Sequence, residues 1–573
     1  MEKKAQGVYM DKLLLSGGTV VNVFTGELEK ANVLIKDSHI IGVGNYTDTD
    51  ADRVEDVTGK VICPGFVDGH IHIESTMLTP AELTRVCLPH GTTAIVADPH
   101  EIANVCGTAG IHYMLEMSEG LPMTVYIMLP SCVPATPFDE SGAVLTADDL
   151  RPFYEQRRVL GLAEMMNYVG VVGEDPDVWE KIADAHIHRR VVDGHAPLLS
   201  GRPLDKYLLA GIRSDHECTS AEEAKERIRK GQWIMIRQGT AARNLTGLLP
   251  LFDEPFCHRC LLVTDDKHPA DLLADGHIDS IIRAAVRAGK SAVTAIQMAT
   301  IRAAHCFELQ NVGAIAPGYK ADLLILDDLD TVAVRDVYCA GKKTVENGKI
   351  IPFTEPVAKE ENRKTVLHSF FLDPLTEEDF RIRETGSKCR VIRIIPGELL
   401  TDEWITEVNR EKNDGIDVER DILKLAVIER HMHTGHKGIG YINGIGLKKG
   451  AIASSVSHDS HNLIVIGTND ADMAIAANRV LAMGGGNAVA ADGKVVSEMP
   501  LPVAGLMTAA PAAEIAEQNR LVREAVHALG APETVEPFMN MAFVSLPVIP
   551  SLKMTTQGLV DVNTQTRVPL VAE

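Results

Sequence analysis

The feature that most constrains the fold is an alternation of short apolar runs with segments of helical periodicity between Val61 and Cys306. The runs have the length and composition of buried strands, and the segments between them carry apolar residues at helical spacing. Parallel strands need such helical crossovers. Eight units of this kind match the size of one (β/α)8 barrel of the TIM type. The runs are VICPGFVDGHIH, TTAIVADPHE, MTVYIMLPSC, VLGLAEMM, RVVDGHAP, AGIRSDHE, WIMIRQG and CLLVTDD.

Short strands with turn residues flank this region on both sides, from Lys12 to Gly44 and from Gly313 to Ile351. We expect the two pieces, residues 1–62 and 311–358, to pair into one small β-sandwich domain that brackets the barrel, residues 63–310. A charged, proline-containing connector, Phe353 to Lys364, leads into a further region. We expect residues 365–573 to form a C-terminal α/β domain, because a chain of 573 residues exceeds the size of a single hydrophobic core.

Charge and composition limit the partners. The formal net charge of −23 repels phosphate backbones and anionic membrane surfaces, so we expect neither a nucleic-acid polymer nor a membrane as partner. No apolar run approaches the length of a membrane span, and the N-terminus lacks the features of a signal peptide. The ten cysteines are scattered, as in proteins of reducing compartments. These features predict a cytoplasmic enzyme without disulfides.

Metal-ligating side chains recur where the predicted strands end, which is where a barrel places its catalytic groups. His70 and His72 form an HxH at the end of the first strand, and alternate strand residues point the same way, so both can face one ion. Six candidates exceed the three protein ligands of a typical mononuclear zinc site, so we expect a binuclear centre with one bridging carboxylate. The candidates are His70, His72, Glu164, His195, His216 and Asp265.

Two other strand ends carry polar groups for the substrate. The second strand is followed by Asp98, His100 and Glu101, which we expect to bind substrate or to move protons. An N-cap of the next helix explains Asp98 equally well. The seventh strand ends in Arg237 and Gln238, whose planar groups suit a planar heterocycle, although a surface salt bridge is the commoner role of arginine.

These residues resemble the amidohydrolase superfamily, through PGFVDGHIH, the later histidines, TDD on the last strand and GAIAPGYKADLLILD after it. Within the superfamily the chain resembles the adenine deaminase family over nearly its whole length. Glu164 stands where many relatives have a carboxylated lysine, as adenine deaminases have it, which argues against hydantoinase or dihydroorotase. The specific motifs are HIHIESTM, DPHEIANVCG, SCVPATPF, GLAEMM, DGHAP, MIRQGTAARNL, SHDSHNLIVIG, PLPVAGLM and SLPVIPSLKMTTQG.

The resemblance implies a hydrolase acting on C–N bonds of cyclic amidines, which converts adenine to hypoxanthine and ammonia in purine salvage by a metal-activated hydroxide. It implies two divalent metal ions, with manganese preferred and iron or zinc as alternatives, and a homo-oligomer, expected to be a dimer. By position, His70, His72 and Asp265 would bind one ion, His195 and His216 the other, and Glu164 both. Asp265 would transfer the proton of the attacking water, and Glu101 or His100 would protonate the ring nitrogen.

Two alternatives stay open at this point. The same metal site would serve a cyclic amide or another aminated purine as substrate. The barrel would also serve as a metal-free scaffold, of the kind known among relatives of dihydropyrimidinase, because a fold alone does not imply a function. In the C-terminal region, His458, Asp459 and His461 either close over the barrel mouth or terminate a turn.

Overall fold

The computed structural model describes residues 11–240, 242–396 and 398–572, and its centre is a closed ring of eight parallel strands. Two arcs, β8 to β12 and β13 to β15, are joined by parallel bridges between Val192 and Ile212 and between Ile71 and Asp265. This ring confirms the predicted barrel. Its strands are β8 (Phe66–Ile71), β9 (Thr92–Ala97), β10 (Thr124–Leu129), β11 (Val159–Met165), β12 (Val191–Gly194), β13 (Ser214–Asp215), β14 (Trp233–Arg237) and β15 (Cys260–Val263).

Helices follow the barrel strands and cover them with apolar faces. In α10, the buried residues Ile278, Ile281, Ile282 and Ala285 recur at helical spacing and form one apolar stripe. Asp175 caps α5 by accepting from two backbone N–H groups of its first turn. The helices of this region are α1 (Pro80–Cys87), α2 (His100–Met117), α3 (Ala147–Leu150), α4 (Tyr168–Gly173), α5 (Pro176–Ile187), α6 (Gly201–Leu209), α7 (Ala221–Arg229), α8 (Leu245–Leu248), α9 (Pro269–Asp275), α10 (Ile278–Arg287), α11 (Ala292–Met298) and α12 (Ile301–Cys306).

The first apolar run of the sequence forms two strands, not one. Its first part, β7 (Val61–Pro64), pairs with β2 and β16 outside the barrel, and only its second part is the barrel strand β8. Gly65 separates the two strands and approaches Thr93 so closely that a Cβ atom would lie 2.1 Å from the Thr93 hydroxyl oxygen. Apolar content alone does not reveal this change of partner, because both strands are buried.

The two β-rich segments that flank the barrel meet in space. A seven-stranded sheet has the order β19-β18-β17-β16-β7-β2-β3 and a four-stranded sheet the order β5-β4-β1-β6, and apolar residues of both segments share one buried cluster. The sandwich packing of the sheets stays a prediction. The remaining strands here are β1 (Lys12–Ser16), β2 (Thr19–Asn22), β3 (Glu27–Lys30), β4 (Asn32–Lys36), β5 (His39–Gly44), β6 (Arg53–Asp56), β16 (Leu323–Leu326), β17 (Val334–Cys339), β18 (Lys342–Glu346) and β19 (Lys349–Ile350).

The C-terminal region is built on an eight-stranded sheet of order β21-β20-β23-β22-β25-β24-β26-β27, with a three-stranded sheet β28-β29-β30 beside it. Helix α14 packs on β24 to β27, and α15 contacts both β27 and the barrel helix α9. The elements are α13 (Glu360–Leu367), β20 (Lys388–Ile394), β21 (Thr401–Glu407), β22 (Leu423–Ile428), β23 (Lys437–Asn443), β24 (Ala451–Ser454), β25 (Leu463–Gly467), α14 (Asp470–Met483), β26 (Gly486–Ala491), β27 (Lys494–Pro500), α15 (Ala512–Ala528), α16 (Pro537–Phe543), β28 (Leu552–Thr555), β29 (Gly558–Asp561) and β30 (Thr566–Val568).

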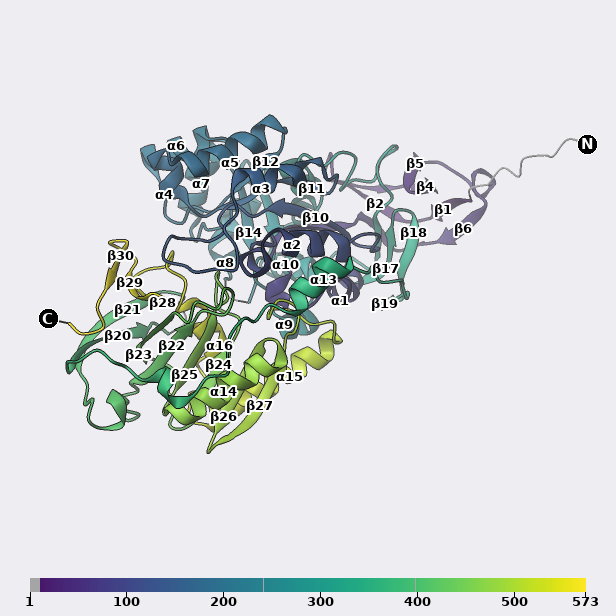
Figure 1. Cartoon of the computed structure of the whole chain (residues 1–573). Helices are drawn as coiled ribbons and strands as arrows, with labels where there is room; N and C mark the ends of the chain where they lie inside the picture. Colours follow the sequence, from purple (N-terminus) through teal and green to yellow (C-terminus); the bar gives the residue numbers. More distant parts are fainter. Residues whose placement is uncertain (1–10, 241, 397, 573) are drawn as a thin grey trace, which may run out of the picture.

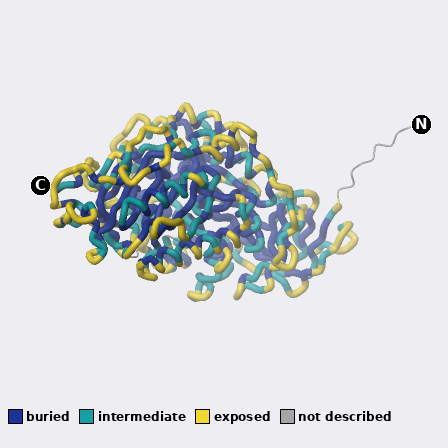
Figure 2. Tube along the Cα trace, turned by 60° about the horizontal axis from the view of Figure 1, so that its bottom comes forward, coloured by how far each residue is buried: buried dark blue, intermediate teal, exposed yellow. Residues whose placement is uncertain are grey.

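The C-terminal sheet and the strands β1, β4, β5 and β6 lie at opposite sides of the barrel (Figure 1). Buried residues run through the length of the molecule and exposed residues line its outside (Figure 2). One hydrophobic cluster contains residues of the barrel and of the C-terminal sheet, so the two regions share a core. Among the described residues, we find no helix with the length and apolar content that a bilayer crossing requires.

A lysine is buried in this C-terminal region. Lys553, on β28, is fully buried, and its Nζ donates to the carbonyl oxygens of Phe543 and Leu399 at 3.0 and 3.2 Å. Burial lowers its pKa to about 7, because the charged amine loses its hydration. The charged form therefore costs stability in the folded state.

We expect the melting temperature of Lys553→Met to rise relative to that of the wild type as the pH falls from 10 to 7. The folded-state pKa lies below the unfolded value, so the penalty in the wild type is absent at high pH and grows as the pH falls toward 7, by up to about 1.4 kcal/mol per pH unit. Thermal unfolding at both pH values measures this difference. Lys449→Met, at an exposed position, is the control, and an equal shift in both variants would contradict the assignment.

Candidate metal centre

The structure brings all six predicted metal ligands together at the carboxyl ends of the barrel strands. Glu164 lies within β11, and the other five lie at or just after the ends of β8, β12, β13 and β15. All are buried except His195, which is partly exposed. Groups of potential ligand atoms that lie within 4.8 Å of one another include His70 with His72 and Asp265, His70 with Glu164 and His216, His195 with His216 and Glu217, and His72 with Glu164, Asp98 and His100.

One half of the centre is formed by His70, His72 and Asp265. The Nε2 atoms of the two histidines lie 3.2 Å apart, and Asp265 Oδ1 lies 3.2 Å from that of His72 and 3.7 Å from that of His70. The Nδ1 atoms face acceptors outside the centre, namely Asp193 Oδ2 at 3.2 Å and the backbone oxygen of Asp98 at 3.1 Å. When each Nδ1 carries the hydrogen, the lone pairs of both Nε2 atoms point into the centre. Histidines that bind metals are held in the same way.

Glu164 connects this half to the other. Its Oε1 lies 3.4 Å from His72 Nε2, and its Oε2 lies 2.7 Å from His195 Nδ1 and 3.1 Å from His216 Nε2. His216 Nδ1 is buried and has no hydrogen-bond partner among the described residues. Burial alone would raise the pKa of Glu164, but His195 and His216 hold it well below the usual range. An ionised carboxylate between two groups of imidazoles fits a bridging position between two cations.

Arg237 is at the rim of the centre but is bound to carboxylates. Its Nη1 donates to Asp265 Oδ2 at 2.7 Å and to Glu217 Oε1 at 2.6 Å. Burial would raise the pKa of Asp265, but Arg237 and the neighbouring histidines hold it well below the usual value. Gln238 follows Arg237, and its Oε1 is buried without a hydrogen-bond partner in the described part of the chain. Gln238 therefore has an acceptor available for a ligand, whereas Arg237 stabilises Asp265.

Two residues of this site were missed in the sequence analysis. Asp193 contacts His70, and Glu217 contacts Arg237. A signal for Asp193 was present, since Asp-Gly-His occurs at 68–70 and again at 193–195, and the aspartate of such a triplet faces the same side of the strand as the histidine. No comparable signal distinguishes Glu217 from other acidic residues that follow a strand.

The three residues after β9 form a second group beside the centre. Asp98 accepts from the backbone N–H of His100 with Oδ1, and Oδ2 lies 3.1 Å from His100 Nδ1, so both oxygens orient His100. His100 Nε2 lies 3.4 Å from Glu101 Oε1. Burial would lower the pKa of His100, but the charges of Asp98 and Glu101 raise it well above its usual value. Asp98 therefore acts here on His100 and on the start of α2.

Glu101 is held by two histidines of the C-terminal region. Its Oε1 lies 2.6 Å from His458 Nδ1, and its Oε2 contacts His461 Nε2. The backbone N–H of Ser457 donates to His461 Nδ1 at 3.2 Å, so the neutral ring carries its hydrogen on Nε2 and donates it to Glu101. Burial lowers the pKa of His461 to about 4, which agrees with a neutral ring. Burial would raise the pKa of Glu101, but these imidazoles hold it well below 4.5. This cluster is a hydrogen-bonded clamp on an ionised carboxylate.

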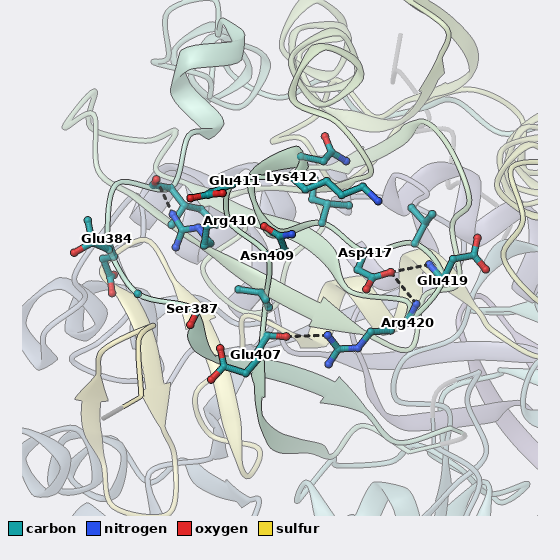
Figure 3. A pocket seen from close by; sticks show the side chains of 18 of the residues that line it. Glu384, Ser387, Glu407, Asn409, Arg410, Glu411, Lys412, Asp417, Glu419 and Arg420 are labelled. Carbon is teal, nitrogen blue, oxygen red and sulfur yellow. Dashed lines mark hydrogen bonds between the residues drawn. The ribbon is translucent and has the colours of Figure 1, made fainter.

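A hollow of about 1070 Å³ lies elsewhere, on the C-terminal region between residues 382 and 420 (Figure 3). Two of its charged side chains bind the protein itself. Asp417 accepts from the backbone N–H groups of Glu419 and Arg420, and the Arg420 guanidinium donates to the backbone oxygen of Glu407. Because none of the six predicted ligands lines it, this hollow is separate from the candidate chemistry.

Comparisons with known proteins place this chain in a family. Residues 61–351 match the amidohydrolase family, and residues 398–566 match the adenine deaminase C-terminal domain. An adenine deaminase 2 of Carboxydothermus hydrogenoformans is 46% identical over 97% of this chain and 96% of its own length. The chain belongs to the adenine deaminase family. A second relative, named adenine deaminase, from Desulfatibacillum aliphaticivorans, is 45% identical over 98% of this chain and 97% of its own length.

A solved structure, a β-aspartyl dipeptidase from Fervidobacterium islandicum AW-1, matches with a TM-score of 0.46 and 14% identity over 61% of this chain and 100% of its own. Membership of the amidohydrolase family implies divalent metal binding, and the histidine and carboxylate cluster at the barrel mouth has the donor set for it. The expectation of a metal-binding barrel hydrolase is confirmed at this level.

We expect Asp193→Asn to weaken metal binding about 10- to 100-fold, the usual effect of losing a carboxylate that orients a ligand histidine. The reason is the contact between Asp193 Oδ2 and His70 Nδ1, which keeps the Nε2 lone pair directed at the centre. Competition with a chelator of known affinity measures the change. Asp330→Asn, at an exposed position, is the matched control. Unchanged affinity in Asp193→Asn would remove Asp193 from this role.

Proposed function

We propose that this chain deaminates adenine by hydrolysis and releases hypoxanthine and ammonia. The observation that carries the proposal is the combination of near full-length identity to relatives named adenine deaminase with the convergence of the six predicted ligands on Glu164. Retention of the complete ligand set argues against the metal-free scaffold. The substrate assignment rests on the similarity, because the donor set alone would also serve another cyclic amidine or amide.

We infer that two divalent ions bind here. His70, His72 and Asp265 would hold one ion, His195 and His216 the other, and Glu164 both, in keeping with its two oxygens facing different histidines. Divalent cations at such a site act as Lewis acids and lower the pKa of water toward neutrality. Manganese suits this mixture of carboxylate and imidazole ligands, and iron or zinc would also be accepted. The homodimer stays a prediction.

The protein's own groups would move the protons. Asp265 accepts the proton of the attacking water and returns it to the departing amino group, while Arg237 orients the carboxylate through Oδ2. His100 protonates the ring nitrogen next to the reacting carbon, and it regains a proton when the added hydroxyl group becomes the carbonyl group of hypoxanthine. Asp98 and Glu101 favour the charged imidazolium of His100, and Glu101 itself, ionised by its clamp, has no proton to give. Of the two donors expected from the sequence, we therefore favour His100.

Gln238 would bind the substrate. Its Oε1 atom is buried and has no hydrogen-bond donor among the described residues. An N–H group of the purine would supply this missing donor. Asp98 and Arg237, both expected from the sequence as substrate-binding residues, would act indirectly, through His100 and Asp265 respectively.

We expect the purified full-length protein to release ammonia from adenine, to lose this activity on chelation and to regain it with manganese. The lost and regained activity follows if water is activated at the cluster around Glu164. An enzyme-coupled ammonia assay with hypoxanthine detection measures it. Cleavage of a cyclic amide without ammonia release from adenine would keep the hydrolase and overturn the substrate.

We expect His100→Asn to lower kcat on adenine by about 10²- to 10⁴-fold, the usual contribution of a positioned general acid. Glu101→Gln should have a smaller effect, because it removes the charge that supports His100 and not the donor. Metal content, measured in the same preparations, should stay at the wild-type value. Full turnover in the double variant would show that neither residue protonates the ring.

A further inference from the structure

The loop between β24 and β25, residues 455–462, brings a carboxyl group of the C-terminal region to the barrel mouth. We propose that Asp459 in this loop is a substrate-binding residue, whose Oδ2 accepts a hydrogen bond from an N–H of the bound purine base. The inference deepens the proposed function and rests on it. It makes the C-terminal region part of the active site and not only a neighbour of the barrel.

The loop is fixed to the barrel on both sides of Asp459. His458 and His461 hold Glu101 of α2, and Asn462 Nδ2 donates to the backbone oxygen of Glu140 at 2.7 Å. These contacts join residues more than 300 positions apart in the sequence. Asp459 therefore has a defined position relative to the barrel strands, as a group that binds a substrate requires.

The C-terminal region holds the same loop from behind. The backbone N–H of His458 donates to the Ala542 oxygen at 2.9 Å, and His431 Nε2 lies 2.7 Å from the Ser460 oxygen. Arg430, which is fully buried, donates to the oxygens of His461, Ser369 and Ala504. Because the barrel holds side chains of this loop and the C-terminal region holds its backbone, the loop cannot turn Asp459 toward solvent without breaking several buried hydrogen bonds.

The carboxyl group of Asp459 lies beside His100. Its Oδ1 lies 3.9 Å from His100 Nε2, the atom that we propose delivers a proton to the purine. The charges of His100, Glu101, His458 and Glu164 all act on Asp459. Asp459 therefore lies beside the group that we propose protonates the base.

One oxygen of this carboxyl group has no partner within the protein. Asp459 is 3% exposed, and Oδ2 is buried without a hydrogen-bond partner among the described residues. Leaving such an acceptor unpaired is costly, so an unpaired buried acceptor in a native protein calls for an explanation, and beside a catalytic group a bound ligand supplies one. The two histidines beside Asp459 are in contrast both paired. Within the described part of this loop, Asp459 Oδ2 is the buried side-chain atom that lacks a hydrogen-bond partner.

The chemistry of that atom specifies the ligand group. A carboxylate oxygen accepts hydrogen bonds, so its complement is an N–H donor. Adenine offers two kinds, the exocyclic amine and the N–H of its five-membered ring. The first would place Asp459 next to the group that leaves, and the second would make it select the free base over a base substituted on that ring nitrogen.

The test combines Asp459 variants with substrates and inhibitors that lack one donor. In full-length metal-loaded enzyme we expect Asp459→Ala to lower kcat/KM for adenine roughly 10- to 100-fold, the worth of one hydrogen bond to a charged group. Asp459→Asn, which keeps an oxygen acceptor, should recover part of this loss. Competitive inhibition by unsubstituted purine, which lacks the amine, and by 9-methyladenine, which lacks the ring N–H, is then measured in each variant.

If Asp459 binds a substrate N–H, the analogue that lacks this donor binds wild type and Asp459→Ala equally, while the other analogue loses affinity in the variant. A structural role would weaken both analogues alike and would overturn the inference. Ser460→Ala, in the same loop, is the control for disturbance of the loop, and metal content and melting temperature are compared in all variants. Unchanged kcat/KM in Asp459→Ala overturns the inference alone, and a wild type without adenine deamination overturns the proposed function as well.

Discussion

The interaction on which the site depends is the burial of the Glu164 carboxylate between two groups of imidazoles. A buried charge is costly unless it is paired and hydrogen-bonded. Here Oε1 faces His72 and Oε2 faces His195 and His216, so each oxygen has a partner from a different strand. Closure of the barrel makes this possible, because only a ring of parallel strands directs the ends of β8, β11, β12 and β13 to one point.

The precision of the centre comes from residues that would not bind a metal themselves. Asp193 and the backbone of Asp98 occupy the outer nitrogens of His70 and His72, and Arg237 holds Asp265. These contacts decide which nitrogen carries a hydrogen and which lone pair faces the centre. Arg237, which its sequence position suggested as a substrate-binding residue, donates hydrogen bonds to two carboxylates, those of Asp265 and Glu217.

The barrel mouth is completed by a loop from the other end of the chain. The sequence of the barrel shows Glu101 only as one of three polar residues after the second strand, yet in the structure it is the attachment point of His458 and His461. A shared hydrophobic core keeps the barrel and the C-terminal sheet together, so this polar clamp need not provide their association and can be used to position groups. Such an arrangement places residues of both regions around the same small volume.

The sequence by itself determined the barrel and the set of candidate ligands, because both follow from local rules. Alternating apolar runs and helical segments predict β/α units, and polar residues at the ends of such strands must face one mouth. Sequence could not decide where β7 ends and β8 begins, since both strands are buried and lie in one continuous run, nor that Asp98 orients His100. The pairs Asp193–His70, Arg237–Asp265 and Glu101–His458 join residues that are distant along the chain, and only tertiary packing brings them together. Local patterns carry information about periodicity, whereas the partner of a buried charge depends on which surfaces meet in three dimensions.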